Sequence, residues 1–302
     1  MQKIVPHLWY DKEAKEAAEF YVETFGKNSR VLSHGVLRNT PSGDCDVMRF
    51  EIWGHEFLSI SAGPYFAPNP SISFMANFDP SQHPDAADQI DRIWKALSDG
   101  GKVLMDLGEY PFSKRYGWVQ DKYGFSWQLI LTDPRGEERP LIIPSLMFTK
   151  DGYGKAEEAT DFYIATFNDS KRGAIARYPA GMEPDEEGKV MFTDFMLEGQ
   201  WFAAMESARE HGYAFNEAVS LLVRCGDQTE IDRLWEALSA VPEAEQCGWL
   251  KDRYGVSWQI APAEMDAMME SEDREAVDRV TRAFLPMKKM DVAALRKAYE
   301  GK

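Results

Sequence analysis

The sequence has few cysteines and no long apolar run. Its three cysteines, Cys45, Cys225 and Cys247, show no C-x-x-C spacing, so we expect neither a disulfide framework nor a zinc knuckle. No apolar run approaches the ~20 residues that span a bilayer, and the first residues lack the apolar core of a signal peptide. We therefore expect reduced thiols in a cytoplasmic protein that has no membrane partner.

Positive charge is also scarce, because 34 Lys and Arg face 50 Asp and Glu, for a net charge of −16. Such a surface repels phosphate backbones, since nucleic-acid binding needs clustered Lys and Arg that displace counterions. We therefore expect no nucleic-acid partner. The 302 residues are 44% hydrophobic and 13% aromatic, which is enough for two medium-sized domains with apolar cores.

The chain is a tandem repeat. Residues 118–128 read WVQDKYGFSWQ and residues 249–259 read WLKDRYGVSWQ, with seven of eleven positions identical. The same register recurs upstream, where Ile4-Val5-Pro6 matches Ile142-Ile143-Pro144. A repeat of this length indicates two copies of one domain. We predict a first domain at 1–133, a polar linker at 134–139, a second domain at 140–262 and a helical tail at 263–302.

Each copy shows the same order of expected elements. A strand at residues 4–10 precedes a helix in which Ala17, Tyr21 and Phe25 recur at the spacing of one buried face. Further strands are expected near residues 47–53, 55–61 and 71–77, then a helix at 88–97 and two strands flanking 121–124. The pattern predicts an α+β fold with curved mixed sheets, helices on one face and a concave opposite face.

Two packing arrangements follow from the repeat and its tail. We expect the two copies to pair within the chain about a pseudo-twofold axis, and the sequence leaves open a further homodimer. The tail carries an apolar stripe and should dock on the folded protein rather than extend into solvent. The expected docking residues are Ala283, Phe284, Met287, Met290, Val292 and Leu295.

Several of these features resemble the vicinal oxygen chelate superfamily, which includes glyoxalase I, extradiol dioxygenases, and fosfomycin and bleomycin resistance proteins. They are the Phe-Tyr pairs at 20–21 and 162–163, the closing D-x-x-G-x-x-W-Q, and two βαβββ modules per copy. Residues 247–259 and 287–295 are similar to the PhnB-like branch, whose members are often labelled 3-demethylubiquinone-9 3-methyltransferase. The resemblance implies tandem glyoxalase-like domains, each of two βαβββ modules.

The methyltransferase label has no support in the residues. Methyl transfer from S-adenosylmethionine usually relies on a glycine-rich loop after the first strand of a doubly wound sheet. The nearest match is Asp151-Gly152-Tyr153-Gly154, which the repeat aligns with the plain acidic turn Asp11-Lys12-Glu13. We interpret it as a strand-to-helix turn.

A divalent metal site is the usual chemistry of the superfamily, and the resemblance implies His and Glu ligands from several strands. This chain has His7 in its first strand, but the second copy has Ser145, and Gln128 and Gln259 stand where Glu is expected. Neutral amides are much weaker ligands. We therefore assign no metal ligands and no cofactor, although a divalent metal remains compatible with the fold. Glu206 is a candidate carboxylate. The other histidines are expected on the surface or in loops: His34, His55, His83 and His211.

The closing strands point to a ligand-binding face. Period-two alternation sends Trp127 and Leu129 to one face and Gln128 to the other. Gln259 follows the same pattern. A buried amide orients a polar ligand or satisfies neighbouring groups in a closed interior, and the sequence leaves both open. Trp118 and Trp249 are expected in the hairpin core. The candidate ligand-binding residues are His7, Trp9, Ser73, Gln128, Phe148, Glu206, Ser220 and Gln259.

Three functions are compatible with these observations, and they leave open whether the protein is an enzyme. The first is a non-enzymatic protein that binds a small apolar or aromatic metabolite in a concave cleft. The second is a metal-dependent lyase, isomerase or dioxygenase. The third is a scaffold with collapsed clefts. Glutamine at both closing-strand positions favours the first over the second.

Overall fold

The structure is a computed structural model that describes residues 1–133 and 138–302. The first copy forms β1 (Ile4–Tyr10), α1 (Ala14–Phe25), β2 (Ser29–Thr40), β3 (Gly43–Ile52), β4 (His55–Ser61), β5 (Ile72–Phe78), α2 (Ala86–Ser98), β6 (Lys102–Tyr110), β7 (Ser113–Gln120) and β8 (Ser126–Leu131). The second copy forms β9 (Ile142–Phe148), η1 (Lys150–Gly152), α3 (Ala156–Thr166), β10 (Lys171–Arg177), β11 (Val190–Leu197), β12 (Gln200–Glu206), β13 (Val219–Cys225), α4 (Gln228–Leu238), η2 (Pro242–Ala244), β14 (Trp249–Lys251) and β15 (Ser257–Pro262). The tail forms α5 (Met265–Met269), α6 (Arg274–Phe284) and α7 (Val292–Glu300).

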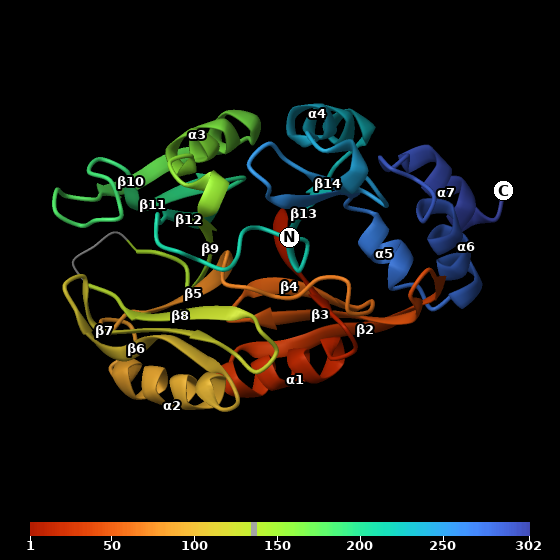
Figure 1. The fold of residues 1–302 in the computed structure, drawn as a ribbon. Coiled ribbons are helices and arrows are strands. Elements are labelled where there is room, and N and C mark those ends of the chain that lie inside the picture. The colour runs from red at the N-terminus through yellow and green to blue at the C-terminus, as the bar shows by residue number, and fades with distance from the viewer. Residues whose placement is uncertain (134–137) are drawn as a thin grey trace.

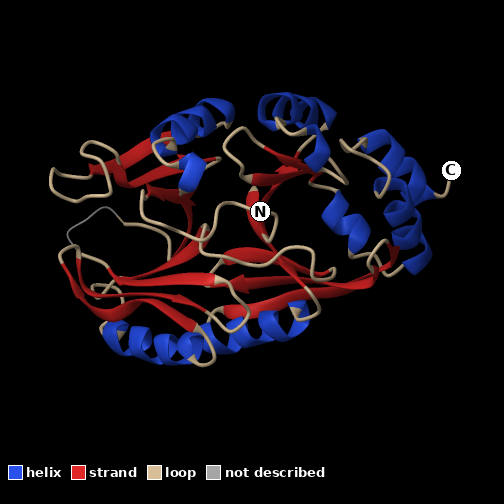
Figure 2. Cartoon of the chain, viewed as in Figure 1, coloured by secondary structure: helices blue, strands red, loops and turns tan. Residues whose placement is uncertain are grey.

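These strands build two mixed sheets, which confirms the α+β class (Figures 1 and 2). Sheet A has the order β14-β15-β13-β1-β4-β3-β2, and sheet B has the order β10-β11-β12-β9-β5-β8-β7-β6. Each sheet therefore takes one module from each copy. The copies meet where β1 pairs with β13 and β5 pairs with β9, both antiparallel. The predicted pairing within the chain is confirmed, and it covers edges that would otherwise expose unpaired backbone groups.

One face of each sheet packs against helices. Sheet A contacts α1 and α4, and sheet B contacts α2 and α3. Trp127 and Trp258 are fully buried on these helix-covered faces, as the alternation predicts. The opposite face of each sheet is called the inner face below.

The aspartate of the closing motif has a structural role in both copies. Asp121 accepts hydrogen bonds from Tyr21 Oη at 2.7 Å and Trp127 Nε1 at 2.9 Å, and from the backbone N–H groups of Tyr123 and Phe125. Asp252 has the same four kinds of donor. Burial raises the pKa of Asp121 to about 6, against the lowering effect of these hydrogen bonds. The motif thus ties the first helix of each copy to its last hairpin.

The two copies differ at the edge of the sheet. The longer segment of the first copy forms β6, which pairs with β7. The second copy lacks this strand, and the tail takes its place beside β14. Cys247 N donates to Met287 O and Gly248 N donates to Lys288 O, both at 2.7 Å. The tail is therefore part of the second copy's hydrogen-bonded framework.

The tail docks as predicted. Phe284, Met290, Val292 and Leu295 are buried in the main core cluster, while Ala283 and Met287 pack against it. Helices α6 and α7 lie at one end of the molecule in Figure 1, and α5 lies between them and sheet A. The three cysteines are free thiols, as expected. In the described part of the chain, every helix is too short or too polar to cross a membrane.

Candidate functional site

The alternation of side chains places four of the predicted residues on the inner face of sheet A. In β1, Ile4, Leu8 and Tyr10 belong to the helix-side core, so His7 and Trp9 point the other way. The same reasoning places Ser220 of β13 and Gln259 of β15 on the inner face. The structure therefore brings these four predicted residues to one surface.

Aromatic rings close over this surface from both sides. Trp249 of β14 lies with its ring centroid 5.7 Å from that of His7 and 6.0 Å from that of Trp9. Two strands, β15 and β13, lie between β14 and β1. On a flat sheet, β14 and β1 would therefore lie about 14 Å apart. Their rings nevertheless meet across the two intervening strands. We call His7, Trp9, Ser220, Trp249 and Gln259 the His7 cluster.

The polar atoms of the His7 cluster are only partly satisfied. Gln259 Nε2 donates to Ser220 Oγ at 2.9 Å. Gln259 Oε1 accepts no hydrogen bond from any described residue and keeps some contact with solvent. The Nδ1 atom of His7 is buried and has no partner within the described chain. Burial lowers the pKa of His7 to about 4, so the imidazole is neutral at pH 7. The cluster therefore offers an unused amide carbonyl and a neutral imidazole.

The rim of the cluster is also aromatic. Trp9 contacts Tyr65 and Phe66, with ring centroids 6.4 and 5.1 Å away, and its Nε1 donates to Gly63 O at 2.7 Å. Tyr65 is 66% exposed. This rim was not predicted, although two adjacent aromatics in a turn segment after Gly63 were a usable signal. Trp249 was predicted in the hairpin core, whereas its side chain is half-buried on the inner face.

In the equivalent region of sheet B, the closing-strand amide is hydrogen-bonded at both its oxygen and its nitrogen. Gln128 Nε2 donates to Ser73 Oγ at 2.7 Å, and Gln128 Oε1 accepts from Tyr116 Oη at 2.7 Å. The repeat places Cys247 at the position of Tyr116 and Ser145 at that of His7. Sheet A therefore lacks the hydroxyl that occupies the amide carbonyl in sheet B. The closed-interior interpretation fits Gln128, and the ligand-binding one fits Gln259.

Phe148 and Glu206 lie on the helix-covered face of sheet B, away from both of these groups. Phe148 is fully buried, with its ring centroid 5.0 Å from that of Phe215. Glu206 accepts hydrogen bonds from the backbone N–H groups of Val190 at 2.7 Å and Ala156 at 3.2 Å. We therefore withdraw both from the candidate site. The repeat register explains the error for Phe148, because it corresponds to the buried Tyr10 rather than to Trp9.

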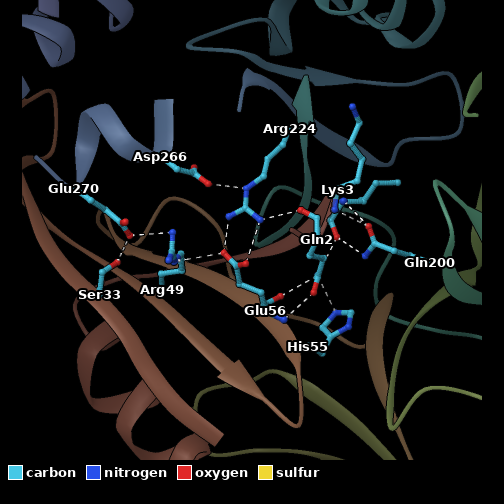
Figure 3. A network of polar contacts seen from close by, with 11 residues as sticks. Gln2, Lys3, Ser33, Arg49, His55, Glu56, Gln200, Arg224, Asp266 and Glu270 are labelled. Atoms are coloured by element: carbon cyan, nitrogen blue, oxygen red, sulfur yellow. Dashed lines mark hydrogen bonds and ion pairs between the residues drawn. The ribbon is translucent and has the colours of Figure 1, made fainter. Parts of the chain in front are cut away.

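The donors of the His7 cluster do not fit a divalent metal ion. A metal site needs several imidazole or carboxylate ligands, but His7 is accompanied by the neutral Ser220 and Gln259. The nearby inner-face carboxylate, Glu56, is held by Arg224 through two hydrogen bonds (Figure 3). Across residues 1–133 and 138–302, no three His, Cys, Asp or Glu side chains converge to hold a metal.

The chain does not fit a methyl donor of the S-adenosylmethionine type either. The segment Asp151-Gly152-Tyr153-Gly154 includes the end of η1 and leads from β9 into α3, which confirms a strand-to-helix turn. Both sheets are mixed rather than doubly wound and parallel.

The remaining histidines also lie outside the cluster. His34 pairs with Asp46 on the surface at 2.6 Å. His55 was expected on the surface or in a loop, but it begins β4 and its ring packs against Phe57.

A family model and several solved structures match this chain. The model of the family described as 3-demethylubiquinone-9 3-methyltransferase matches residues 2–130 and 140–261. A PhnB protein from Bacillus cereus is 34% identical over 43% of this chain and 100% of its own, with a TM-score of 0.39. Glyoxalase I from Zea mays is 14% identical over 90% of this chain and 96% of its own, with a TM-score of 0.56. No curated protein matched the chain.

Proposed function

We propose that this chain, which belongs to the 3-demethylubiquinone-9 3-methyltransferase family, binds an uncharged aromatic group of a small molecule at the His7 cluster of sheet A. No metal ion or methyl donor takes part in this binding. The unused carbonyl of Gln259, the cross-strand neighbour of Trp249, is the observation that carries the proposal. A ligand hydroxyl that donates to Oε1 would complete the amide's hydrogen bonds, while Trp9 and Trp249 would contact the aromatic part.

The electrostatics of the cluster favour an uncharged group at this end of the ligand. His7 is uncharged at pH 7 because of its lowered pKa, and the other four residues of the cluster carry no charge. The protein as a whole carries a net charge of −16, so its long-range field does not draw an anionic group to the cluster. Apolar contact and one or two hydrogen bonds would supply the affinity.

Titration calorimetry with 2-naphthol tests the proposal, and naphthalene serves as the ligand without a hydroxyl. A hydrogen bond contributes about 0.5–1.5 kcal/mol. Gln259→Leu should therefore weaken 2-naphthol binding by about twofold to tenfold and leave naphthalene binding unchanged. Gln128→Leu is the matched control in sheet B and should change neither affinity.

Two results would overturn the proposal. One is the absence of 2-naphthol binding to the wild-type protein. The other is an equal loss of affinity in Gln259→Leu and Gln128→Leu, which would place the ligand elsewhere or reveal a general effect on folding. Unfolding curves of both variants identify a folding effect, because they show whether each retains its native stability.

A further inference from the structure

The C-terminal tail places two carboxylates on the inner face of sheet A. Helix α5 has only five residues, and Asp266 Oδ2 lies 2.7 Å from Arg224 Nε. Glu270, just after the helix, lies 3.1 Å from a terminal nitrogen of Arg49 and accepts from Ser33 Oγ at 2.6 Å. Figure 3 shows these contacts between the tail and strands β2, β3 and β13.

The tail carboxylates satisfy the two guanidinium groups incompletely. Arg224 is only 3% exposed and hydrogen-bonds to Glu56. The Nε atoms of Arg224 and Arg49 are nevertheless buried with no aligned hydrogen-bond acceptor in the described chain, and Asp266 Oδ2 likewise has no aligned donor. Buried charged donors without aligned acceptors are costly. A better-placed anion would therefore improve the hydrogen bonding of this pair.

Charge counting around the two arginines supports the same conclusion. Glu56 is the strand carboxylate that pairs with both Arg49 and Arg224, so this group of three residues carries one positive charge. Asp266 and Glu270 of the tail more than neutralise that charge. Sheet B lacks this arrangement, because the repeat places Asp194 at the position of Arg49 and Asn77 at that of Arg224. The cationic pair is therefore particular to sheet A.

The arginine pair shares an inner face with the His7 cluster. Ser220, Leu222 and Arg224 alternate along β13 on this face. Four residues of strand separate Ser220 from Arg224 by about 13 Å. Leu222 and the half-buried Leu58 of β4 supply apolar surface between the two ends.

We infer that Arg49 and Arg224 form a carboxylate-binding subsite, in which Asp266 and Glu270 stand in for the acid group of a ligand. The ligand class is an aromatic group joined by an apolar chain to a carboxylate. The aromatic end occupies the His7 cluster, and the carboxylate displaces the tail carboxylates from the arginines. This inference rests on the proposed function, because it uses the His7 cluster as the aromatic end of the site.

The experiment compares 6-phenylhexanoate with its neutral analogue 6-phenylhexan-1-ol by titration calorimetry on the full chain. The double variant Asp266→Asn with Glu270→Gln removes the competing charges. It should bind 6-phenylhexanoate at least tenfold more tightly than the wild type, and bind the alcohol with unchanged affinity. Glu264→Gln is the matched control, since this tail residue pairs with Arg296 instead, and it should change neither affinity.

Hydrogen exchange on the wild-type protein provides a second readout that needs no variant. Saturating 6-phenylhexanoate should speed the exchange of the α5 amide protons, whereas the alcohol should not. Unchanged acid affinity in the double variant, or unchanged exchange at α5, would overturn the inference. If the alcohol and 2-naphthol still bind in that case, the proposed function stands without the subsite. If neither neutral probe binds, both proposals fail together.

Discussion

Asp252 is the acceptor of four hydrogen bonds and is 1% exposed, so its removal should strongly destabilise the protein. In the wild type, Tyr163 Oη and Trp258 Nε1 donate to the Asp252 carboxylate at 2.7 and 2.8 Å. Asp252→Ala leaves both of these buried donors without a partner. Each unsatisfied buried donor costs about 1–3 kcal/mol. The backbone N–H groups of Tyr254 and Val256 lose their acceptor as well. We therefore expect a loss of about 4 kcal/mol.

Urea unfolding followed by tryptophan fluorescence measures this loss as a shift of the midpoint at constant slope. Tyr163→Phe removes one donor instead of the acceptor, so it should cost only about 1 kcal/mol. Asp79→Ala is the control, because Asp79 accepts hydrogen bonds from Ser81 at a partly exposed turn. The reasoning is refuted if Asp252→Ala costs no more than Asp79→Ala.

Three further predictions concern the tail, the histidines and metal content. Leu295→Ala should cost about 2–5 kcal/mol because Leu295 is fully buried, and a loss in urea unfolding as small as that of exposed Lys297→Ala would contradict tail docking. Burial lowers the pKa of His55 from 6.5 to about 3. At pH values between these two, His55 is protonated in the unfolded chain and neutral in the folded chain. Stability should then fall as the pH drops from 6.5 towards 4, and His55→Phe should flatten that slope in unfolding curves. Protein purified without a metal-binding tag should contain less than one equivalent of transition metal by elemental analysis, and stoichiometric metal that disappears in His7→Ala would contradict the absence of a metal site.

Most of the fold was predictable because the repeat and the alternation both report on buried positions. The strand predicted at residues 4–10 is β1, and the helix predicted at 88–97 lies within α2. The strands β2 and β6 were missed. Both lie at sheet edges, and most of their side chains are at least partly exposed, so they lack the regular alternation of a half-buried strand.

The candidate site was predictable only in part. Alternation along a single strand is a local property, and it placed Gln128 and Gln259 correctly on the inner faces. Which amide stays unsatisfied depends on the folded hairpin, where Tyr116 donates to Gln128 whereas Cys247 Sγ donates to Leu285 O of the tail. The contact between His7 and Trp249 across three strand spacings is likewise absent from any local pattern.

The segment that follows the closing strand of each copy makes an equivalent contact with opposite charge. After β8, Arg139 of the linker pairs with Asp194 of sheet B, with its Nε atom 2.8 Å from Asp194 Oδ2. Its guanidinium carbon lies 3.8 Å from the centroid of the Trp201 ring. After β15, the tail brings Glu270 to Arg49, which occupies the position of Asp194 in the repeat. A linker that continues into the next domain is covalently held at both ends. The tail is held at its start and by the docking of α6 and α7. Of the two segments, the linker and the tail, a competing carboxylate would therefore displace the tail at α5 at the lower cost.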